Sequence, residues 1–380
     1  MQDQDTYLDI TELFGLPLRT GIQRVERELI RHWPGPGRLI LCAYDHELDD
    51  LRVLPQAASG ILTAASRGIR LEVAEERSAL HGLVAGEAPV RIPPGLRRLV
   101  NPELFFDIRR ARFYETIAQR SQVEVFWLVY DFLPYLEPRW FDQGSSRTAM
   151  PYLRALRSIR HVAFISEHTR QDYRRRVMRE ERRDGPVIVL GGDGLGLGAQ
   201  RFFPGRAGYV VLGSIEPRKR VAAILEAFVA LWAAGSQAPL TVVGRLLPHA
   251  QQEIELMATL RNQPLFRHLD HASDTAVREV LAGARAMIFA SEGEGFGLPP
   301  FESLYHGIPV IVSASVPSIE MLPAHGQLRL EEVSARCIAA AVRSLEDDAV
   351  ADRLWAETAR LEIPSWRDFA ETFARWVHGH

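Results

Sequence analysis

Hydrophobic and polar positions along this chain fall into two recurring patterns, short continuous apolar runs and longer segments with apolar residues at helical spacing. In the first half the apolar runs predict strands at 7–13, 38–44, 123–129, 162–165 and 187–190. Helical spacing predicts helices from residue 21, near 108–120, at 148–158 and from 169. Residues 46–100 show neither pattern clearly.

The same alternation restarts in the second half, after a glycine-rich stretch at 191–198 that we interpret as a linker. Strands are predicted at 209–212, 240–243, 266–269, 286–290 and 309–312. Helices are predicted at 221–233, near 249–261, at 274–282, from 300, twice within 331–360, and at 366–377. Strands that alternate with helices favour α/β domains with mostly parallel sheets, which bind ligands at the carboxyl ends of their strands.

Length and composition narrow the class of protein. A chain of 380 residues with 47% hydrophobic and 24% charged residues fits two soluble domains. The formal net charge of -3 gives no reason to expect nucleic acid as a partner. Cys42 and Cys337 match no metal-binding spacing. The acidic N-terminus and the lack of a long apolar run predict a cytoplasmic protein without a secretory signal.

Positive charge is concentrated between Arg147 and Arg183, a segment that contains eleven arginines and only four acidic residues. A basic helix of this kind can lie on anionic lipid, which would place the protein at the inner face of the plasma membrane. A solvated helix face is the alternative, and it is favoured until an apolar stripe is shown.

Lys219 is the one lysine among 45 basic side chains. Lysine offers a compact point charge on a flexible stem, which suits a phosphate oxygen. The residue follows a predicted strand and precedes a predicted helix, so amides and the helix dipole add positive potential beside it and Arg218. The alternatives are chance in an arginine-rich chain and a solvated turn.

The segment Glu294–Glu302 has a more specific pattern. Gly295 and Gly297 allow a ligand to approach the backbone closely, and Pro299-Pro300 favour the first turn of a helix. We expect Glu302 to lie in that first turn. Each glutamate alone could be an ordinary loop or helix-start acid.

Together with Gly307-Ile308-Pro309-Val310-Ile311, this segment resembles the signature of the family 4 retaining glycosyltransferases, which have the GT-B fold. Weaker similarities to the same family occur at 130–134, 165–167, 213–219 and 242–245. Residues 20–25 are similar to the opening of a bacterial subgroup that builds surface polysaccharides, often containing mannose.

The resemblance implies a role for each matching residue. Lys219 and Arg218 would neutralise the diphosphate of a nucleotide sugar, and Glu294 would hold the transferred sugar. Asp131 would lie near the reacting carbon or the acceptor hydroxyl. The remaining donor-binding residues would be Gly21, Ser214, Arg245, Gly295, Phe296, Gly297, Leu298 and Glu302.

The chain departs from the family at two positions. Tyr130 stands where many relatives have histidine, and Ser214 where many have arginine. The only Asp-x-Asp pattern is Asp3-Gln4-Asp5, which we expect in a frayed terminus and not in a metal site. We therefore expect neither a metal nor another cofactor.

The predicted fold is thus α/β of the GT-B class, with two doubly wound domains that face each other across a cleft. We expect an acceptor-side domain at 1–203, a donor-binding domain at 204–362 and a C-terminal helix at 363–380 that crosses back to the first domain. The predicted function is metal-independent transfer of a hexose, with GDP-mannose as the best guess, to a saccharide or a lipid-linked saccharide. A sugar-nucleotide-binding module without catalysis is the alternative. A nicotinamide dehydrogenase is disfavoured, because residues 14–21 lack its glycine pattern.

Overall fold

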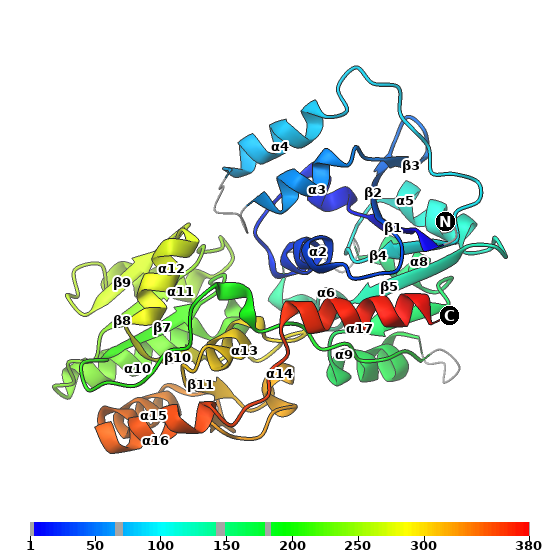
Figure 1. Cartoon of the computed structure of the whole chain (residues 1–380). Coiled ribbons are helices and arrows are strands. Elements are labelled where there is room, and N and C mark those ends of the chain that lie inside the picture. The colour runs from blue at the N-terminus through cyan, green and yellow to red at the C-terminus, as the bar shows by residue number, and fades with distance from the viewer. Residues whose placement is uncertain (1–3, 65–70, 142–148, 179–183, 380) are drawn as a thin grey trace. The chain divides into compact units, whose positions relative to one another are not determined.

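The computed structural model describes residues 4–64, 71–141, 149–178 and 184–379, which form two compact units (Figure 1). The first unit comprises Met1–Leu136, Gln143–Leu190 and Trp366–His380, and the second comprises Glu137–Asp142 and Gly191–Ser365. The stretch at 191–198 therefore belongs to the second unit. The Gly192 amide donates to the carbonyl of Pro364 (2.8 Å), so the two chain segments that leave this unit lie together.

The first unit is built on a six-stranded sheet in the order β3-β2-β1-β4-β5-β6. Only the β2–β3 pair is antiparallel. The strands are β1 Thr6–Asp9, β2 Leu39–Asp45, β3 Asp50–Val53, β4 Arg98–Asn101, β5 Glu124–Val129 and β6 His161–Phe164. The order reverses between β1 and β4, so the loops that follow these strands lie next to each other.

The helices of the first unit are mostly short. They are α1 Thr11–Gly15, α2 Gly21–His32, α3 Ala57–Leu62, α4 Val73–Gly82, α5 Ile108–Ile117, α6 Leu133–Leu136, α8 Met150–Leu156, α9 Glu167–Asp172 and α17 Trp366–His378. Helix α2 begins where predicted because the Thr20 hydroxyl accepts the Gln23 amide, and it buries Val25, Leu29 and Ile30.

Two predictions for this unit need correction. The strand predicted at 7–13 ends at Asp9, because the carboxylates of Asp9 and Glu103 accept the amides of residues 11–13 and start α1 instead. The strand predicted at 187–190 is only a single bridge between Phe164 and Val187. The stretch 46–100, for which the sequence predicted no elements, contains β3, α3, α4 and most of β4.

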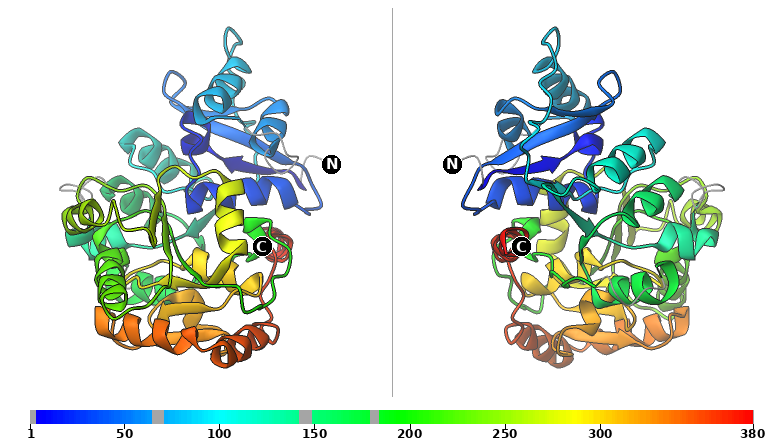
Figure 2. Two further views of the ribbon diagram at one scale, coloured as in Figure 1. Left: turned by 90° about the vertical axis from the view of Figure 1, so that its left-hand side faces the viewer. Right: turned by 90° about the vertical axis from the view of Figure 1, so that its right-hand side faces the viewer.

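The second unit has a parallel six-stranded sheet in the order β12-β11-β10-β7-β8-β9. The strands are β7 Gly208–Leu212, β8 Leu240–Val243, β9 Phe266–Leu269, β10 Ala284–Phe289, β11 Val310–Ser313 and β12 Gln327–Leu330. The helices are α10 Val221–Ala233, α11 Gln251–Thr259, α12 Asp274–Ala282, α13 Leu298–Tyr305, α14 Pro317–Glu320, α15 Ala335–Glu346 and α16 Asp348–Thr358. The last two helices pack on each other, as both views of Figure 2 show.

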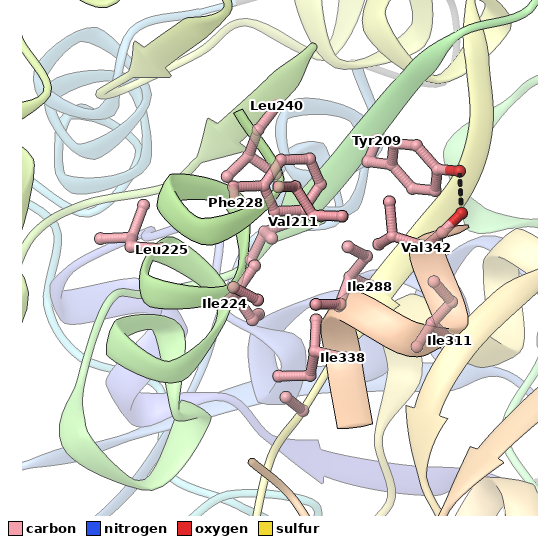
Figure 3. Close-up of a cluster of buried hydrophobic side chains, with 14 of the residues drawn as sticks. Tyr209, Val211, Ile224, Leu225, Phe228, Leu240, Ile288, Ile311, Ile338 and Val342 are labelled. Carbon is pink, nitrogen blue, oxygen red and sulfur yellow. Dashed lines mark hydrogen bonds between the residues drawn. The ribbon is translucent and has the colours of Figure 1, made fainter. Parts of the chain in front are cut away.

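The core of this unit lies between the sheet and helices α10 and α15. Ile224 and Phe228 of α10 meet Val211 and Ile288 of the sheet, with Ile338 behind them (Figure 3). The Tyr209 hydroxyl is also buried there, and it donates to the carbonyl of Val342 (3.1 Å). This satisfied hydrogen bond lets a polar atom stay in an apolar layer.

The final helix, α17, packs on the first unit, as predicted. It lies along α2 (Figure 1), and its Trp376 ring meets Phe126 of β5 edge to face, with centroids 5.2 Å apart. Phe369 and Phe373 are completely buried on the same face. The apolar stripe of the sequence is therefore the surface that joins the end of the chain to its beginning.

We predict that Phe373→Ala lowers the free energy of unfolding of the first unit by about 3–5 kcal/mol, because it leaves a cavity in a fully packed site. Denaturant unfolding followed by circular dichroism measures the change. Glu371→Ala, on the exposed face of the same helix, is the control and should change stability by less than about 0.5 kcal/mol. Equal effects of the two substitutions would contradict the packing described.

Candidate active site

The candidate donor residues gather where the strand order of the second sheet reverses. Strands β7 and β10 are neighbours, yet the chain runs from β7 toward β9 and from β10 toward β12. The loops at 213–220 and 290–297 therefore leave adjacent strand ends, which is where open α/β sheets bind ligands.

The first of these loops is shaped by close backbone contacts. Gly244, at the end of β8, has a φ of 147°, and a Cβ there would lie 1.8 Å from the carbonyl oxygen of Gly213. The Ile215 amide donates to the carbonyl of Arg245 (2.8 Å), which holds the loop to the end of β8. A single 3-10 turn, Pro217–Lys219, then leads through a left-handed Arg220 into α10. These backbone contacts fix the direction of the Arg218 and Lys219 side chains.

Lys219 and Arg218 converge on one carboxylate of the second loop. The Lys219 ammonium lies 2.5 Å from Oε1 of Glu294, and Arg218 Nη1 lies 3.0 Å from the same oxygen. Arg218 also contacts Glu216 (2.8 Å), whose Oε1 accepts the Ser214 hydroxyl as well. The Lys219 ammonium stands 4.7 Å above the Phe289 ring. Two cations and two carboxylates thus form one compact cluster.

The cluster is largely withdrawn from solvent, since the side chains of Lys219, Arg218 and Glu294 are 10–15% exposed. Burial raises the pKa of the Glu294 carboxyl, but Lys219 and Arg218 outweigh it and the net shift is downward. Burial lowers the pKa of the Lys219 ammonium, and Glu294 offsets part of that effect. The carboxylate therefore helps to keep the lysine charged in a partly dry site.

The glycine loop that follows is fixed by its own glycine. Gly297 has a φ of 90°, and a Cβ there would lie 2.3 Å from Cγ1 of Val316. Ser318 holds the loop from below, because its amide donates to the Phe296 carbonyl and its hydroxyl to the Gly297 carbonyl, both at 2.8 Å. Helix α13 starts at Leu298 immediately afterwards.

Three predicted donor residues occupy positions that the sequence did not indicate. Glu302 is buried in α13 and lies beyond its first turn, because the helix already starts at Leu298. Phe296 is a core residue whose ring packs edge to face on Phe301, with centroids 5.0 Å apart. Arg245 is exposed, and it joins the loop through its backbone.

Two residues predicted for the site, Gly21 and Asp131, belong to the first unit. Gly21 begins α2, and a Cβ there would have no described atom within 4 Å. Asp131 follows β5, and its Oδ1 accepts the Leu133 amide at the start of α6 (3.0 Å). Tyr130 is buried, and its hydroxyl has no hydrogen-bond partner among the described residues.

A buried charge network in the same unit was not predicted. Arg110 is completely buried and contacts Asp9 (2.8 Å) and Glu103 (2.7 Å), while Tyr114 donates to Asp9 (2.6 Å). Glu26, on α2, is also completely buried, and within the described part of the chain neither of its oxygens is hydrogen-bonded. In the sequence, the acidic residues Asp9 and Glu103, at or just after the ends of β1 and β4, could have indicated this network. Nothing in the sequence indicates that Arg110 is their partner.

The described residues contain no group of three or more side chains suited to hold a metal ion. The Asp-x-Asp pattern lies partly outside them, since Asp3 is not described. We expected Asp5 to lie in a frayed terminus, but it is buried and forms an ion pair with Arg38 (2.6 Å).

A surface pocket of about 510 Å³ lies elsewhere, between the loop after α1 and helix α4. Its lining is Leu16, Val73, Ala74, Arg77, Ser78 and His81. None of the candidate residues lines it, so the location of the candidate site rests on the strand order and the ion cluster. No helix in the described parts of the chain is long and apolar enough to cross a bilayer.

Comparison with known proteins gives a family match within the second unit. Residues 199–362 match the family described as glycosyl transferases group 1. The chain is 27% identical over 331 residues to the serotype-specific mannosyltransferase WbdA of Escherichia coli. That match covers 80% of this chain but 37% of WbdA. The O-antigen chain mannosyltransferase B of E. coli is 28% identical over 155 residues, which cover 40% of this chain and 39% of that protein.

Solved structures confirm the predicted fold class. Anabaena HepE in complex with UDP and glucose has a TM-score of 0.66 at 14% identity, with 99% of this chain and all of HepE covered. Sucrose-phosphate synthase of Thermosynechococcus elongatus has a TM-score of 0.64 at 15% identity, with 98% of each chain covered. Identities this low show the shared GT-B fold alone.

We predict that Glu26→Gln changes how stability depends on pH. Burial, and then the neighbouring Glu103, raise the pKa of Glu26 well above its usual value of 4.5. The Glu103 oxygens accept backbone and guanidinium donors, so the retained proton belongs on Glu26. Because the folded state binds this proton more tightly, the wild type loses stability as pH rises above about 4.5. The variant lacks this loss.

The melting temperature of Glu26→Gln relative to wild type should therefore increase from pH 5 to pH 8. Glu371→Gln, at an exposed carboxyl of α17, is the control and should show a flatter difference. A Glu26→Gln difference independent of pH would show that Glu26 is ionised in the folded protein.

Proposed function

We propose that this chain, whose residues 199–362 belong to the group 1 glycosyltransferases, transfers a hexose from a nucleotide diphosphate sugar to a saccharide acceptor, free or lipid-linked, in bacterial surface polysaccharide synthesis. The observation that carries the proposal is the convergence of Lys219 and Arg218 at the reversal of strand order in the second sheet. Two preorganised cations at such a position suit a diphosphate better than any other part of a sugar nucleotide.

Lys219 and Arg218 would stabilise the negative charge that grows on the diphosphate as it leaves. In the ligand-free protein Glu294 and Glu216 occupy these cations. A bound diphosphate would take over part of those contacts, which frees Glu294 to accept hydrogen bonds from the sugar hydroxyls. Ser214 would hold Glu216 away from the phosphate.

The glycine loop would bind the rest of the transferred sugar. The amides of Gly295 to Leu298 lie just before and at the start of α13, so they would face the ligand with the positive end of that helix behind them. Glu302 would accept from the ribose hydroxyls. Arg245 is exposed at the end of β8, where it could reach the nucleotide.

Transfer with retention would follow from the same charges. The bond between the anomeric carbon and the diphosphate oxygen breaks, and the acceptor oxygen bonds to that carbon on the same face. The leaving phosphate takes the proton of the acceptor hydroxyl, so no protein base is required. Asp131 would orient the acceptor hydroxyl or stabilise the positive charge on the sugar, and Gly21 would let the start of α2 approach the diphosphate.

The names of the relatives support mannose as the transferred hexose, and GDP-mannose is the proposed donor. This chain spans 37% of WbdA, so the whole activity of that protein does not transfer to it. The UDP and glucose named for HepE come from a structure 14% identical, and they therefore do not decide the donor here.

We also propose that the basic region, residues 147–183, contacts anionic membrane lipid at the inner face of the membrane. Arg174, Arg175 and Arg176 are exposed in one turn, which supports the contact. Against it, Arg176 and Arg174 lie near acids, at 3.4 Å from Asp172 and 3.7 Å from Asp184. Co-sedimentation with anionic vesicles tests this contact.

A binding module without catalysis remains the second candidate, and Lys219 discriminates the two. We predict that Lys219→Ala lowers turnover of the nucleotide sugar by about 100- to 1,000-fold, the usual loss for one charge-stabilising donor. Release of nucleoside diphosphate in the presence of acceptor measures it. Lys219→Arg should be impaired as well, because the planar fork does not reproduce the reach of the ammonium.

Arg267→Ala, an exposed arginine on β9, is the matched control and should retain full turnover. If folded Lys219→Ala turned over normally, the phosphate role would be wrong. If wild-type protein bound the nucleotide sugar but released no diphosphate with any acceptor, the binding module would be the better description.

Metal independence is a further prediction. Because Lys219, Arg218 and the loop amides would supply the positive charge, transfer should continue at its full rate in excess EDTA. The measurement is turnover before and after dialysis against EDTA, followed by addition of Mg²⁺ or Mn²⁺. Loss of activity with EDTA and recovery with either ion would contradict the proposed charge stabilisation.

A further inference from the structure

We infer that Trp140 is a positioning residue for the donor site, an inference that rests on the proposed function. Trp140 belongs to a docking segment, Glu137–Trp140, which groups with the second unit although the chain on both sides of it belongs to the first. The segment forms a single 3-10 turn begun by Pro138, in which the Trp140 amide donates to the carbonyl of Glu137 (3.1 Å).

The Trp140 ring lies directly on Gly293. A Cβ on this glycine would be 2.3 Å from Cζ3, 2.7 Å from Cη2 and 3.2 Å from Cε3 of Trp140, and these three are its nearest neighbours. The backbone of Gly293 does not have a positive φ. A side chain at this position would therefore meet the Trp140 ring first, and the ring would have to shift.

Gly293 in turn connects to the cations of the site. Its carbonyl accepts Arg218 Nη1 (2.6 Å) and the Ser291 hydroxyl (3.2 Å). The next residue, Glu294, carries the carboxylate that Lys219 and Arg218 share. Trp140 thus covers one side of a peptide whose other contacts fix both the carboxylate and the guanidinium.

The physical effect of this cover is twofold. The ring removes water from the peptide beside the ion cluster, which strengthens the charged hydrogen bonds within it. It also limits the positions that the residue 293–294 backbone can take. The Arg139 guanidinium also stacks on the Trp140 ring, with its carbon 5.3 Å from the ring centroid, and Arg139 pairs with Glu137 (3.4 Å).

The docking segment is also close in sequence to the other candidate group. Asp131 accepts the amide that starts α6, and α6 ends at Leu136, just before the segment. Along the chain, the short helix α6 therefore connects Asp131, the carboxylate predicted for the acceptor side, to the segment that carries Trp140.

The test is a double-mutant cycle with Trp140→Ala and Gly293→Ala, read out as binding of GDP and UDP by calorimetry. Each single variant should weaken binding of the diphosphate that wild type prefers by about tenfold, because small misplacements in a charged site are costly. In the Trp140→Ala background Gly293→Ala should add nothing, since its nearest obstacle is gone. Trp140→Phe keeps a six-membered ring and should recover most of the affinity.

Two controls match these changes. Tyr135→Ala removes an exposed aromatic side chain of α6, and Gly198→Ala adds a methyl group where no described atom lies within 4 Å. Neither should change the affinity or the melting temperature. Trp140→Ala should also leave the melting temperature without nucleotide within about 2 °C of wild type, which separates positioning from general stability.

Each outcome decides one claim. Unchanged affinity in Trp140→Ala, or losses of the two single variants that simply multiply in the double variant, would overturn the role of Trp140 alone. Failure of wild type to bind any nucleoside diphosphate would overturn the proposed function and this inference with it. A tenfold loss shared by both single variants and not deepened in the double variant supports the inference.

Discussion

The ion cluster of Lys219, Arg218, Glu216 and Glu294 is the interaction on which the candidate site depends. Two cations side by side in a partly dry site would repel each other, and the two carboxylates make the group neutral as a whole. The cations are therefore held ready without a ligand. Charged groups that are already held in place need little rearrangement when charge develops beside them, which is the condition for electrostatic stabilisation of a transition state.

The first unit has a second charge cluster at the equivalent place in its sheet, after β1 and β4, but its physical state differs. Arg110, Asp9 and Glu103 are completely buried, and their contacts tie the start of α1 to the end of the sheet. No ligand charge can reach such a group without breaking the fold. The partial exposure of the Lys219 cluster, 7–15% for each side chain, is thus what separates a candidate site from a structural network.

The sequence was sufficient for the elements whose patterns are local. Strand β10 and helix α17 are strongly apolar or strongly amphipathic, and both were predicted within a few residues. Helix α1 was missed because its start depends on Glu103, far along the chain, and a short apolar run cannot reveal such a partner. The same limit explains Glu302 and Phe296, whose residue types fit a ligand site although burial in α13 and against Phe301 decides their surroundings. Contacts such as Trp140 on Gly293 have no signal in a single sequence.

The glycines of the chain differ in the physical reason that the structure gives for each one. Gly244 is required by a neighbouring carbonyl, Gly297 by its positive φ and Val316, and a side chain at Gly293 would meet the Trp140 ring. In the sequence these positions are indistinguishable, and the structure supplies a separate reason for each. Gly21 has none, because no described atom would obstruct a side chain there and its φ is not positive. Gly15, Gly82, Gly95 and Gly198 are equally unobstructed, so open space alone assigns no role to Gly21. Its proposed approach to the diphosphate rests on the resemblance of residues 20–25 to the family.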